Sequence, residues 1–446
     1  MLKSKDDLMV NSLVNELRQI DQSEFDFPNY KRDDNIHRIF QYPAMMIPIT
    51  QKLIIEIIAK YLPDNANVID PFMGSSTSIL SCMEVGLNAF GHDVNPLAVL
   101  ISKVKTGPLD CVLFQNELFN IESNLNQDNS TEISVSFEKI NKWFKIDTQV
   151  ELSKIRRAIQ KEGDIHVRRF FWVILAETIR TSSNDRTSTY KLHQRPVEEV
   201  ERRNISAIEE FLRLSKRSIK DVKKFKEKLD ESSLLSNLNY KGNVSVKWGD
   251  TMQKIDTQLQ FSLLVSSPPY GDNLSTVTYG QHSFLELQWI DKNDIDENID
   301  YDYLRTTQEI DRKSLGGVIV SKKIKEQKQS LFQKAPVLKS FIDSLSIVDS
   351  DKIPKIIAFI DDFDKSLDVI LPKLSENAYY VWTIGNRSVA RKEVPNDKIL
   401  IELMSSRNIP LIHQVERTIL NKRMPNRNKT TKTMNKEKIL IFHKKN

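Results

Sequence analysis

Two acidic residues, with a run of small residues after the first, form the first group whose spacing suggests chemistry. Asp70 ends a short apolar segment and opens the turn Asp70-Pro71-Phe72-Met73-Gly74-Ser75-Ser76-Thr77. Small residues that open a helix leave backbone N–H groups free and let a ligand approach them closely. Asp93 follows 23 positions after Asp70, close to the spacing at which an acid after a second strand binds a ribose diol. The pattern favours a nucleoside-containing cofactor over a tight turn with a capping or exposed acid.

The second candidate site is Ser267-Pro268-Pro269-Tyr270, which follows the apolar segment 261–265. Two consecutive prolines remove two backbone donors and fix φ, so the loop is stiff and its carbonyl groups are free to accept. Together with the serine hydroxyl and the tyrosine ring, these carbonyls suit a flat ring that bears an exocyclic NH2 group. An ordinary proline turn with a buried tyrosine is the alternative.

The two motifs, in this order, resemble those of the DNA amino-methyltransferases, which use S-adenosyl-L-methionine to modify exocyclic nitrogens. That family typically has an Asp-Pro-Phe-x-Gly-Ser-Gly-Thr turn and an (Asp/Asn/Ser)-Pro-Pro-(Tyr/Phe/Trp) loop, and this chain departs from it at Ser76, where glycine is common. The serine form of the loop is similar mostly to the cytosine-N4 enzymes, whereas Asp or Asn is more usual for adenine-N6. The resemblance covers about 40–104, 240–290 and 350–446.

The resemblance implies a set of residues that bind the cofactor. These are Asp70, Phe72, Gly74, Ser75 and Thr77 at the methionine end, Asp93 at the ribose hydroxyls and Asp250 at the adenine edge. Tyr42-Pro43 would form a preceding contact segment. No metal is implied.

The resemblance also implies a mechanism that uses residues 267–270 as the catalytic loop. Ser267 Oγ and the carbonyl of Pro268 would accept the two N–H bonds of the target amine, whose lone pair is otherwise delocalised into the ring. With Pro269 stiffening the loop, Tyr270 would stack on the base after it has flipped out of the duplex, and the amine would attack the sulfonium methyl in line. Methylation at carbon 5 would need a cysteine after a proline, which is absent from the sequence.

Basic residues are concentrated near the C-terminal end of the sequence. The net charge is +5, but residues 417–446 hold ten Lys or Arg against one acid. Lys422, Arg423 and Arg427 are therefore predicted to contact the phosphates of duplex DNA, the implied substrate. Arg186 is a further candidate for such a contact. A solvated tail or face is the alternative for all four.

The elements predicted around these motifs first alternate between strands and helices and then become mostly helical. Periodicity and turn residues predict a helix over 51–61, a strand over 66–69, a helix after Thr77 and a strand from 88, with later strands at 244–248, 261–265 and 378–384. Helices are expected over 6–20, 152–160, 167–180, 197–229, 353–374 and 397–405, and two strands at 411–420 and 438–443. The predicted fold class is α/β, a Rossmann-like methyltransferase sheet with a C-terminal antiparallel hairpin and a mostly helical inserted subdomain.

Six segments follow from this reading of the chain. They are an N-terminal helical extension (1–40), the first half of the core (41–104), a helical insertion that acts as a DNA clamp (105–240), core strands with the catalytic loop (241–272), a second insertion for target recognition (273–350), and the end of the core with a basic hairpin loop (351–446).

Composition excludes several classes of protein. With 446 residues, 39% of them hydrophobic, the chain is not wholly disordered, and two cysteines cannot form a disulfide scaffold or a thiolate zinc site. The histidines lack metal-ligand spacing. We expect no export signal and no membrane contact, because no apolar stretch reaches the ~18 residues of a span. The expected location is the cytoplasm of a bacterial or archaeal cell.

The predicted function is therefore that of a site-specific cytosine-N4 DNA methyltransferase, the modification enzyme of a restriction-modification system with a cognate restriction endonuclease as partner. Three alternatives stay open. The first is an adenine-N6 DNA methyltransferase. The second is an RNA guanine-N2 methyltransferase, although those usually carry Asp at the position of Ser267 and an RNA-binding domain ahead of the core. The third is a non-catalytic nucleic-acid-binding relative.

Overall fold

A seven-stranded sheet forms the centre of the computed structural model, which describes residues 5–26, 36–318, 324, 328–419 and 436–444. The strand order is β10 (Leu411–Thr418), β11 (Lys436–His443), β7 (Leu374–Gly385), β6 (Phe261–Ser266), β1 (Asn67–Asp70), β2 (Asn88–Asp93) and β5 (Val244–Trp248). Neighbouring strands from β5 to β7 are parallel, while β11 runs antiparallel to both β7 and β10. The predicted α/β class, with a Rossmann-like sheet and a C-terminal antiparallel hairpin, is confirmed.

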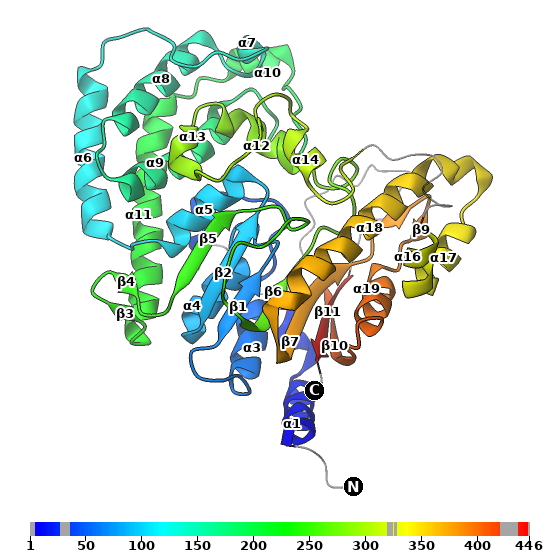
Figure 1. Cartoon of the computed structure of the whole chain (residues 1–446). Coiled ribbons are helices and arrows are strands. Elements are labelled where there is room, and N and C mark those ends of the chain that lie inside the picture. The colour runs from blue at the N-terminus through cyan, green and yellow to red at the C-terminus, as the bar shows by residue number, and fades with distance from the viewer. Residues whose placement is uncertain (1–4, 27–35, 319–323, 325–327, 420–435, 445–446) are drawn as a thin grey trace.

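Both faces of this sheet are covered by helices, as Figure 1 shows. Val68 of β1 packs in one core cluster with α3 (Pro48–Ala59), α4 (Thr77–Val85) and α5 (Pro96–Thr106). The next residue, Ile69, packs in a second cluster with α18 (Ile353–Ile370) and α19 (Asn396–Ser405). Successive side chains of a strand point to opposite faces, so strands buried on both faces need continuous apolar runs. This explains why the central strands are apolar without alternation.

A helical lobe lies between β2 and β5 in the chain and packs beyond α5 (Figure 1). It contains α6 (Cys111–Gln127), α7 (Ile140–Trp143), α8 (Ile146–Gln160), α9 (Ile165–Ser182), α10 (Val197–Arg202) and α11 (Ala207–Glu231). Helix α9 is its core: the run from Phe170 to Ala176 is fully buried. The apolar residues of this run therefore serve packing, as their helical spacing predicts.

The prediction of a single helix over 197–229 is wrong, because the residues between α10 and α11 are not helical. Ser206 caps α11, its hydroxyl accepting from the backbone N–H of Glu209 at 3.2 Å. The carboxylate of Glu151 accepts from Ser206 Oγ at 3.1 Å and from the N–H of Ile208 at 3.2 Å. A serine cap and a negative charge at the amino end both stabilise a new helix start. The signal was the Ser-x-x-Glu pattern, which periodicity alone overlooks.

The helix expected over 353–374 is too long. Helix α18 ends at Ile370, a 3-10 turn covers Leu371–Lys373, and Leu374 already belongs to β7. Pro372 lies in that turn, and a proline has no N–H with which to continue the helix hydrogen bonds.

The second insertion is divided between the two sides of the molecule (Figure 1). Helices α12 (Tyr279–Leu287) and α13 (Lys292–Ile295) pack against α9 and α5, and α14 (Glu309–Lys313) packs against α12. Helices α16 (Gln329–Lys334) and α17 (Pro336–Asp343) pack together, α17 against α19, and the 3-10 helix Ile347–Lys352 leads into α18. The second insertion therefore borders the space between the two lobes from both sides.

The remaining elements are short or peripheral. They are α1 (Lys5–Gln19), α2 (Gln22–Asp26), the 3-10 helix η2 (Ile36–Ile39), and the two-stranded pairs β3 (Leu235–Ser236) with β4 (Asn239–Tyr240) and β8 (Ser388–Val389) with β9 (Lys392–Glu393). Helix α1 contacts α3 and β10. Within the described ranges, the helices are too short or too polar to cross a bilayer.

The turn after β1 contains a strained residue at the position where the sequence departs from the family pattern. Ser76 is fully buried and has φ 66° and ψ 35°, in the left-handed region. A residue that has a Cβ is disfavoured in this region by roughly 1–2 kcal/mol. The turn thus keeps a glycine-like shape although it carries serine.

We therefore expect Ser76→Gly to raise the free energy of unfolding by up to about 1 kcal/mol, since relief of strain exceeds the entropy that glycine adds to the unfolded chain. Ser81→Gly, in the interior of α4, is the control and should lose about 1 kcal/mol. Chemical denaturation of both variants measures the difference. A loss at position 76 as large as that at position 81 would contradict the strain.

Candidate functional site

Asp70 lies behind the turn rather than in the pocket where its expected role would place it. Its carboxylate is fully buried and accepts from Ser266 Oγ at 2.5 Å, from the N–H of Phe72 at 3.0 Å and from the hydroxyl of Ser78. Burial raises the pKa of Asp70 to about 6, against the hydrogen bonds from Ser266 and Ser78, which lower it. All three donors belong to the protein, so this carboxylate joins the turn, α4 and the end of β6.

Asp93 holds the middle of the turn. Its two oxygens accept from the N–H of Gly74 at 2.9 Å and from the N–H of Asn95 at 2.8 Å. Burial raises the pKa of Asp93 to about 6, partly offset by these backbone hydrogen bonds. Gly74 has φ +48°, and an added Cβ would lie 3.5 Å from the ring of Tyr42. A glycine here therefore satisfies the left-handed backbone conformation, whereas a Cβ would meet Tyr42 only at ordinary contact distance.

The rest of the turn supplies polar groups and one aromatic ring. The carbonyl of Ser75 accepts from the fully buried Lys105 at 3.0 Å, while among the described residues its buried hydroxyl has no hydrogen-bond partner. Thr77 begins α4 and is also buried. The ring of Phe72 lies 6.5 Å from the ring of Trp382. An unpaired buried hydroxyl beside free helix-start N–H groups is suited to a polar ligand.

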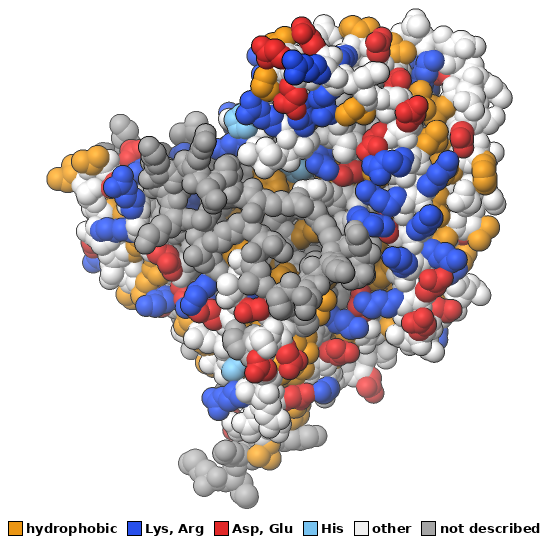
Figure 2. Space-filling model, turned by 180° about the vertical axis from the view of Figure 1, so that it is seen from behind, with side chains coloured by type: hydrophobic (Ala, Val, Ile, Leu, Met, Phe, Trp, Pro, Cys, Tyr) orange, Lys and Arg blue, Asp and Glu red, His pale blue; other side chains and the backbone are white. Residues whose placement is uncertain are grey.

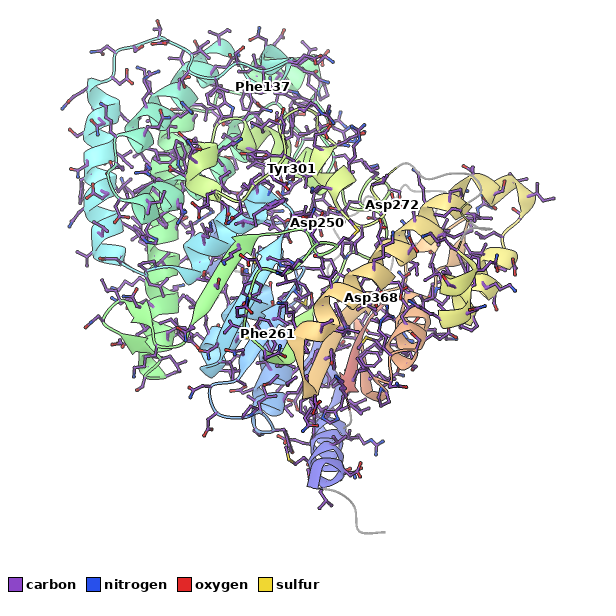
Figure 3. The ribbon with its side chains drawn as sticks, viewed as in Figure 1. Phe137, Asp250, Phe261, Asp272, Tyr301 and Asp368 are labelled. Carbon is purple, nitrogen blue, oxygen red and sulfur yellow. The ribbon has the colours of Figure 1, made fainter. Side chains whose placement is uncertain are left out.

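Asp250 follows β5 and closes the cavity from the other side. Its carboxylate accepts from the N–H of Met252 at 3.0 Å and lies 3.9 Å from Lys313 Nζ. Burial raises the pKa of Asp250, and the charge of Lys313 lowers it. Figure 3 places Asp250 and Asp272 between the two lobes, whereas Phe261 lies at the opposite end of the sheet. Strands that run parallel bring their carboxyl ends to one edge, where ligands of such sheets bind.

The Ser267–Tyr270 loop follows β6 directly, and its two polar side chains touch each other. Ser267 Oγ lies 3.2 Å from Tyr270 Oη, and Tyr270 Oη donates to Glu437 Oε1 at 2.9 Å. Glu437 Oε2 in turn accepts from Arg417 Nε at 2.9 Å and Nη2 at 2.8 Å. Sequence reasoning missed Glu437 and Arg417 because no local pattern marks them. Only the register of β10 and β11, which sets these two residues opposite each other, brings them to the loop.

The loop backbone is fixed from a third direction. Asn396 Nδ2 donates to the carbonyls of Tyr270 at 3.0 Å and Gly385 at 2.9 Å. Arg387 Nη1 lies 3.3 Å from Asp272 Oδ2, and a Cβ at Gly271 would meet the Arg387 guanidinium at 2.4 Å. Glycine after the tyrosine thus permits the arginine to pack against the loop.

Both motifs border one cavity of about 1890 Å³. The predicted site residues among its lining are Phe72, Gly74, Ser75, Thr77, Asp93, Asp250, Ser267, Pro268, Pro269 and Tyr270, together with Tyr42 and Pro43 of the preceding segment. Asp70 is not among them. The volume exceeds the ~300–1,000 Å³ of a pocket for one small ligand, so the cavity has room for two ligands.

The candidate phosphate contacts fare differently. Lys422, Arg423 and Arg427 lie outside the described residues. Arg186 is exposed and does not border the cavity. Another arginine of the helical lobe, Arg168, pairs with Asp294 at 2.8 Å.

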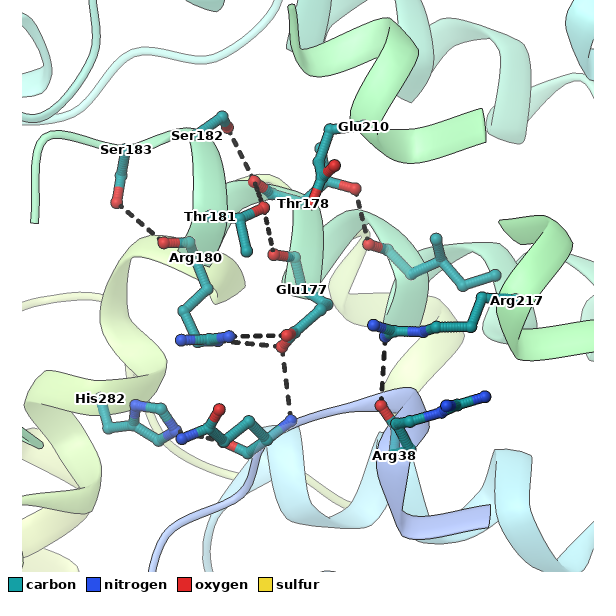
Figure 4. A network of polar contacts seen from close by, with 12 residues as sticks. Arg38, Glu177, Thr178, Arg180, Thr181, Ser182, Ser183, Glu210, Arg217 and His282 are labelled. Carbon is teal, nitrogen blue, oxygen red and sulfur yellow. Dashed lines mark hydrogen bonds and ion pairs between the residues drawn. The ribbon is translucent and has the colours of Figure 1, made fainter. Parts of the chain in front are cut away.

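A polar network joins the helical lobe to the segment that enters the cavity (Figure 4). Glu177 of α9 pairs with Arg180 at 2.7 Å and accepts from the N–H of Gln41 at 3.3 Å. His282 of α12 contacts the carbonyl of Gln41 at 3.1 Å. Since Gln41 precedes Tyr42, these contacts from α9 and α12 fix the residue that packs over Gly74.

Comparison with known proteins gives the family. No family model matches the chain. The chain is 30% identical to the type II methyltransferase M.MvaI of Kocuria varians over 462 residues, which cover 99% of this chain and 98% of that protein. It is 31% identical over 133 residues to the type II methyltransferase M.MjaII of Methanocaldococcus jannaschii, covering 28% of this chain and 24% of that one. A solved rRNA methyltransferase, aviRa of Streptomyces viridochromogenes, aligns over 95% of this chain and 93% of its own at 8% identity and TM-score 0.29. Because the match to M.MvaI spans nearly both whole chains, this protein belongs to the type II methyltransferase family.

Proposed function

We propose that the protein transfers the methyl group of S-adenosyl-L-methionine to the exocyclic N4 of cytosine in duplex DNA, at a specific site and after base flipping. The observation that supports this most is that the Gly74 turn and the Ser267–Tyr270 loop border one cavity. A cofactor and a target base bound there would be neighbours. The names of the type II relatives further suggest a modification enzyme of a restriction-modification system, with a restriction endonuclease as its partner.

The residues around the turn fit the cofactor in polarity and shape. The unpaired hydroxyl of Ser75 and the start of α4 suit the polar methionine end, and the φ of +48° at Gly74 gives the turn that presents them its shape. Asp93 and Asp250, at the ends of adjacent parallel strands, suit the ribose hydroxyls and the adenine edge. S-adenosyl-L-methionine supplies an activated methyl group on a positively charged sulfur.

The loop residues fit an aromatic amine. Ser267 Oγ and the Pro268 carbonyl offer two acceptors, which would draw the amine lone pair out of the ring, and Tyr270 offers an aromatic face. In-line attack by this nitrogen would form the N–C bond as the carbon–sulfur bond breaks and its electron pair returns to sulfur. The methylated amine would then pass one N–H proton to solvent water. We propose cytosine-N4 rather than adenine-N6 because the serine form of the loop resembles mostly the cytosine-N4 enzymes.

The helical lobe offers a surface for the DNA backbone. Helix α11 exposes Lys216, Lys220, Lys223 and Lys224 along one side. Figure 2 shows Lys and Arg side chains gathered over this part of the molecule. The helix also packs against η2, which leads to the cavity segment at Gln41. We assign to this stripe the clamp role predicted for the insertion, and target recognition to residues 273–350.

The direct test is the identity of the methylated base. Purified protein, labelled S-adenosyl-L-methionine and either duplex DNA or tRNA should yield N4-methylcytosine in DNA, identified by nucleoside mass spectrometry. Ser267→Ala should slow the transfer step while cofactor affinity stays near normal, because the lost acceptor acts mainly as the lone pair localises. N6-methyladenine, a methylated tRNA guanine or no product would each replace this proposal by one of the alternatives.

Cofactor affinity should depend on pH through Asp93. The ionised carboxylate accepts from ribose hydroxyls, and the pKa of Asp93 is about 6 in the empty protein. Affinity should therefore be constant above about pH 7 and fall as pH drops through 6, by up to about tenfold per unit. Calorimetry should find the Asp93→Asn variant weaker and without this pH dependence. If the affinity of the Asp93→Asn variant depended on pH as the wild type does, another titrating group would be responsible.

The raised pKa of Asp93 also affects the stability of the protein without cofactor, and there the pH dependence has the opposite sign, because burial disfavours the ionised carboxylate. A carboxyl whose pKa is raised on folding favours the protonated native state. Asp93 thus makes the empty protein less stable as pH rises from about 4 to 6.

Neutralising the α11 stripe should weaken DNA binding without altering sequence preference. Lys220→Ala/Lys224→Ala should reduce the slope of log K against log[salt] by about 2, since each phosphate contact contributes about 0.9. Lys365→Ala/Lys398→Ala, with two exposed lysines of α18 and α19, is the charge-matched control. Equal losses in both variants would mean a general charge effect, and loss at the cognate site alone would mean base reading.

A further inference from the structure

We propose that Glu437 and the hydroxyl of Tyr270 are positioning residues that orient the Ser267 hydroxyl so that its oxygen accepts from the target amine. This rests on the proposed function and adds a device that reaches the loop from the C-terminal hairpin. Three contacts carry it: Ser267 Oγ to Tyr270 Oη at 3.2 Å, Tyr270 Oη to Glu437 at 2.9 Å, and Glu437 to Arg417 at 2.8 Å.

The direction of the hydrogen bonds in this chain is set at its far end. A carboxylate paired with a guanidinium only accepts, and a guanidinium only donates. Tyr270 must therefore donate its single O–H to Glu437. The only role left for Tyr270 Oη toward Ser267 is that of acceptor, so Ser267 donates its own O–H to the tyrosine.

The consequence falls on the atom that meets the substrate. A serine hydroxyl on its own can either donate or accept, and a donating hydroxyl would face the N–H bonds of an amine unproductively. With its hydrogen held by Tyr270, Ser267 Oγ presents lone pairs to the cavity that it borders. The amine is then offered an acceptor that is already oriented before it arrives.

The surroundings keep the chain of contacts rigid. Arg417 is 6% exposed, and the side chain of Glu437 is 14% exposed. Glu437 faces Arg417 across one strand pair and Gly385 across the other. Burial raises the pKa of Tyr270, and the charge of Glu437 adds to the effect. The tyrosine thus stays protonated and able to donate.

This arrangement separates two roles of Tyr270 that an aromatic substitution tests. Tyr270→Phe keeps the ring for stacking and removes only the hydroxyl. We expect cofactor affinity and base extrusion, followed by 2-aminopurine fluorescence, to stay near wild type. The single-turnover rate of methyl transfer should fall roughly tenfold, the size of one lost hydrogen bond.

The decisive measurement repeats Tyr270→Phe in a Ser267→Ala background. If the hydroxyl acts through Ser267, the second substitution should change the rate by less than about twofold, since its target is already absent. Glu437→Gln keeps the shape of the side chain but can also donate. As a single substitution it should lower the rate of methyl transfer, and it should lower the rate of Tyr270→Phe little further. Tyr380→Phe is the matched control and should retain the wild-type rate, because its buried hydroxyl has no hydrogen-bond partner among the described residues.

Two results would overturn the inference: a wild-type rate in Tyr270→Phe, or an equal loss in the presence and absence of the Ser267 hydroxyl. All rates are measured on whichever nucleic-acid amine the wild type methylates. A base other than cytosine would therefore refute the proposed function while the rate ratios still test the orientation of Ser267.

Discussion

The hydrogen bond between Asp70 and Ser266 is the constraint on which the site depends. Asp70 ends β1 and Ser266 ends β6, and these strands are parallel neighbours. A buried carboxylate is costly unless donors surround it, and here Ser266, Ser78 and the N–H of Phe72 all donate to it. The Asp70 carboxylate thereby fixes the turn after β1 against Ser266, the residue that precedes the Ser267 loop. If the two motifs separated, this buried carboxylate would lose the hydrogen bond from Ser266 and keep only the donors of its own turn and α4.

Around this bond, each lobe fixes one wall of the cavity. The helical lobe reaches it through Glu177 and Gln41, which set the position of Tyr42 over Gly74. The other side reaches it through Asn396 and Glu437, which hold the Tyr270 backbone and hydroxyl. Residues that touch the cavity therefore depend on partners more than a hundred positions away. Distant changes in α9 or β11 would act on the chemistry through these contacts.

Local signals were sufficient for the strands and turns that form the sheet. The alternating segment 244–248 and the switch from β1 through the small-residue turn to α4 are specified by neighbouring residues, and the structure has them at those positions. The break at Ser206 was missed because helical spacing continues across it, although a capping pattern is present. The places of Asp70 behind the turn and of Glu437 beside the loop could not be predicted. Both follow from strand register, which one sequence without its partners does not display.

The account's central claim is that cofactor and target base meet in one cavity, with Ser267 at the amine. A crystal structure of the protein with S-adenosyl-L-homocysteine and a duplex that carries its recognition site measures this directly. We predict the amino acid end of the ligand at residues 72–77 and an extruded cytosine with N4 at about 3 Å from Ser267 Oγ. A duplex whose bases all stay stacked, or an extruded base held away from residues 267–270, would contradict the account.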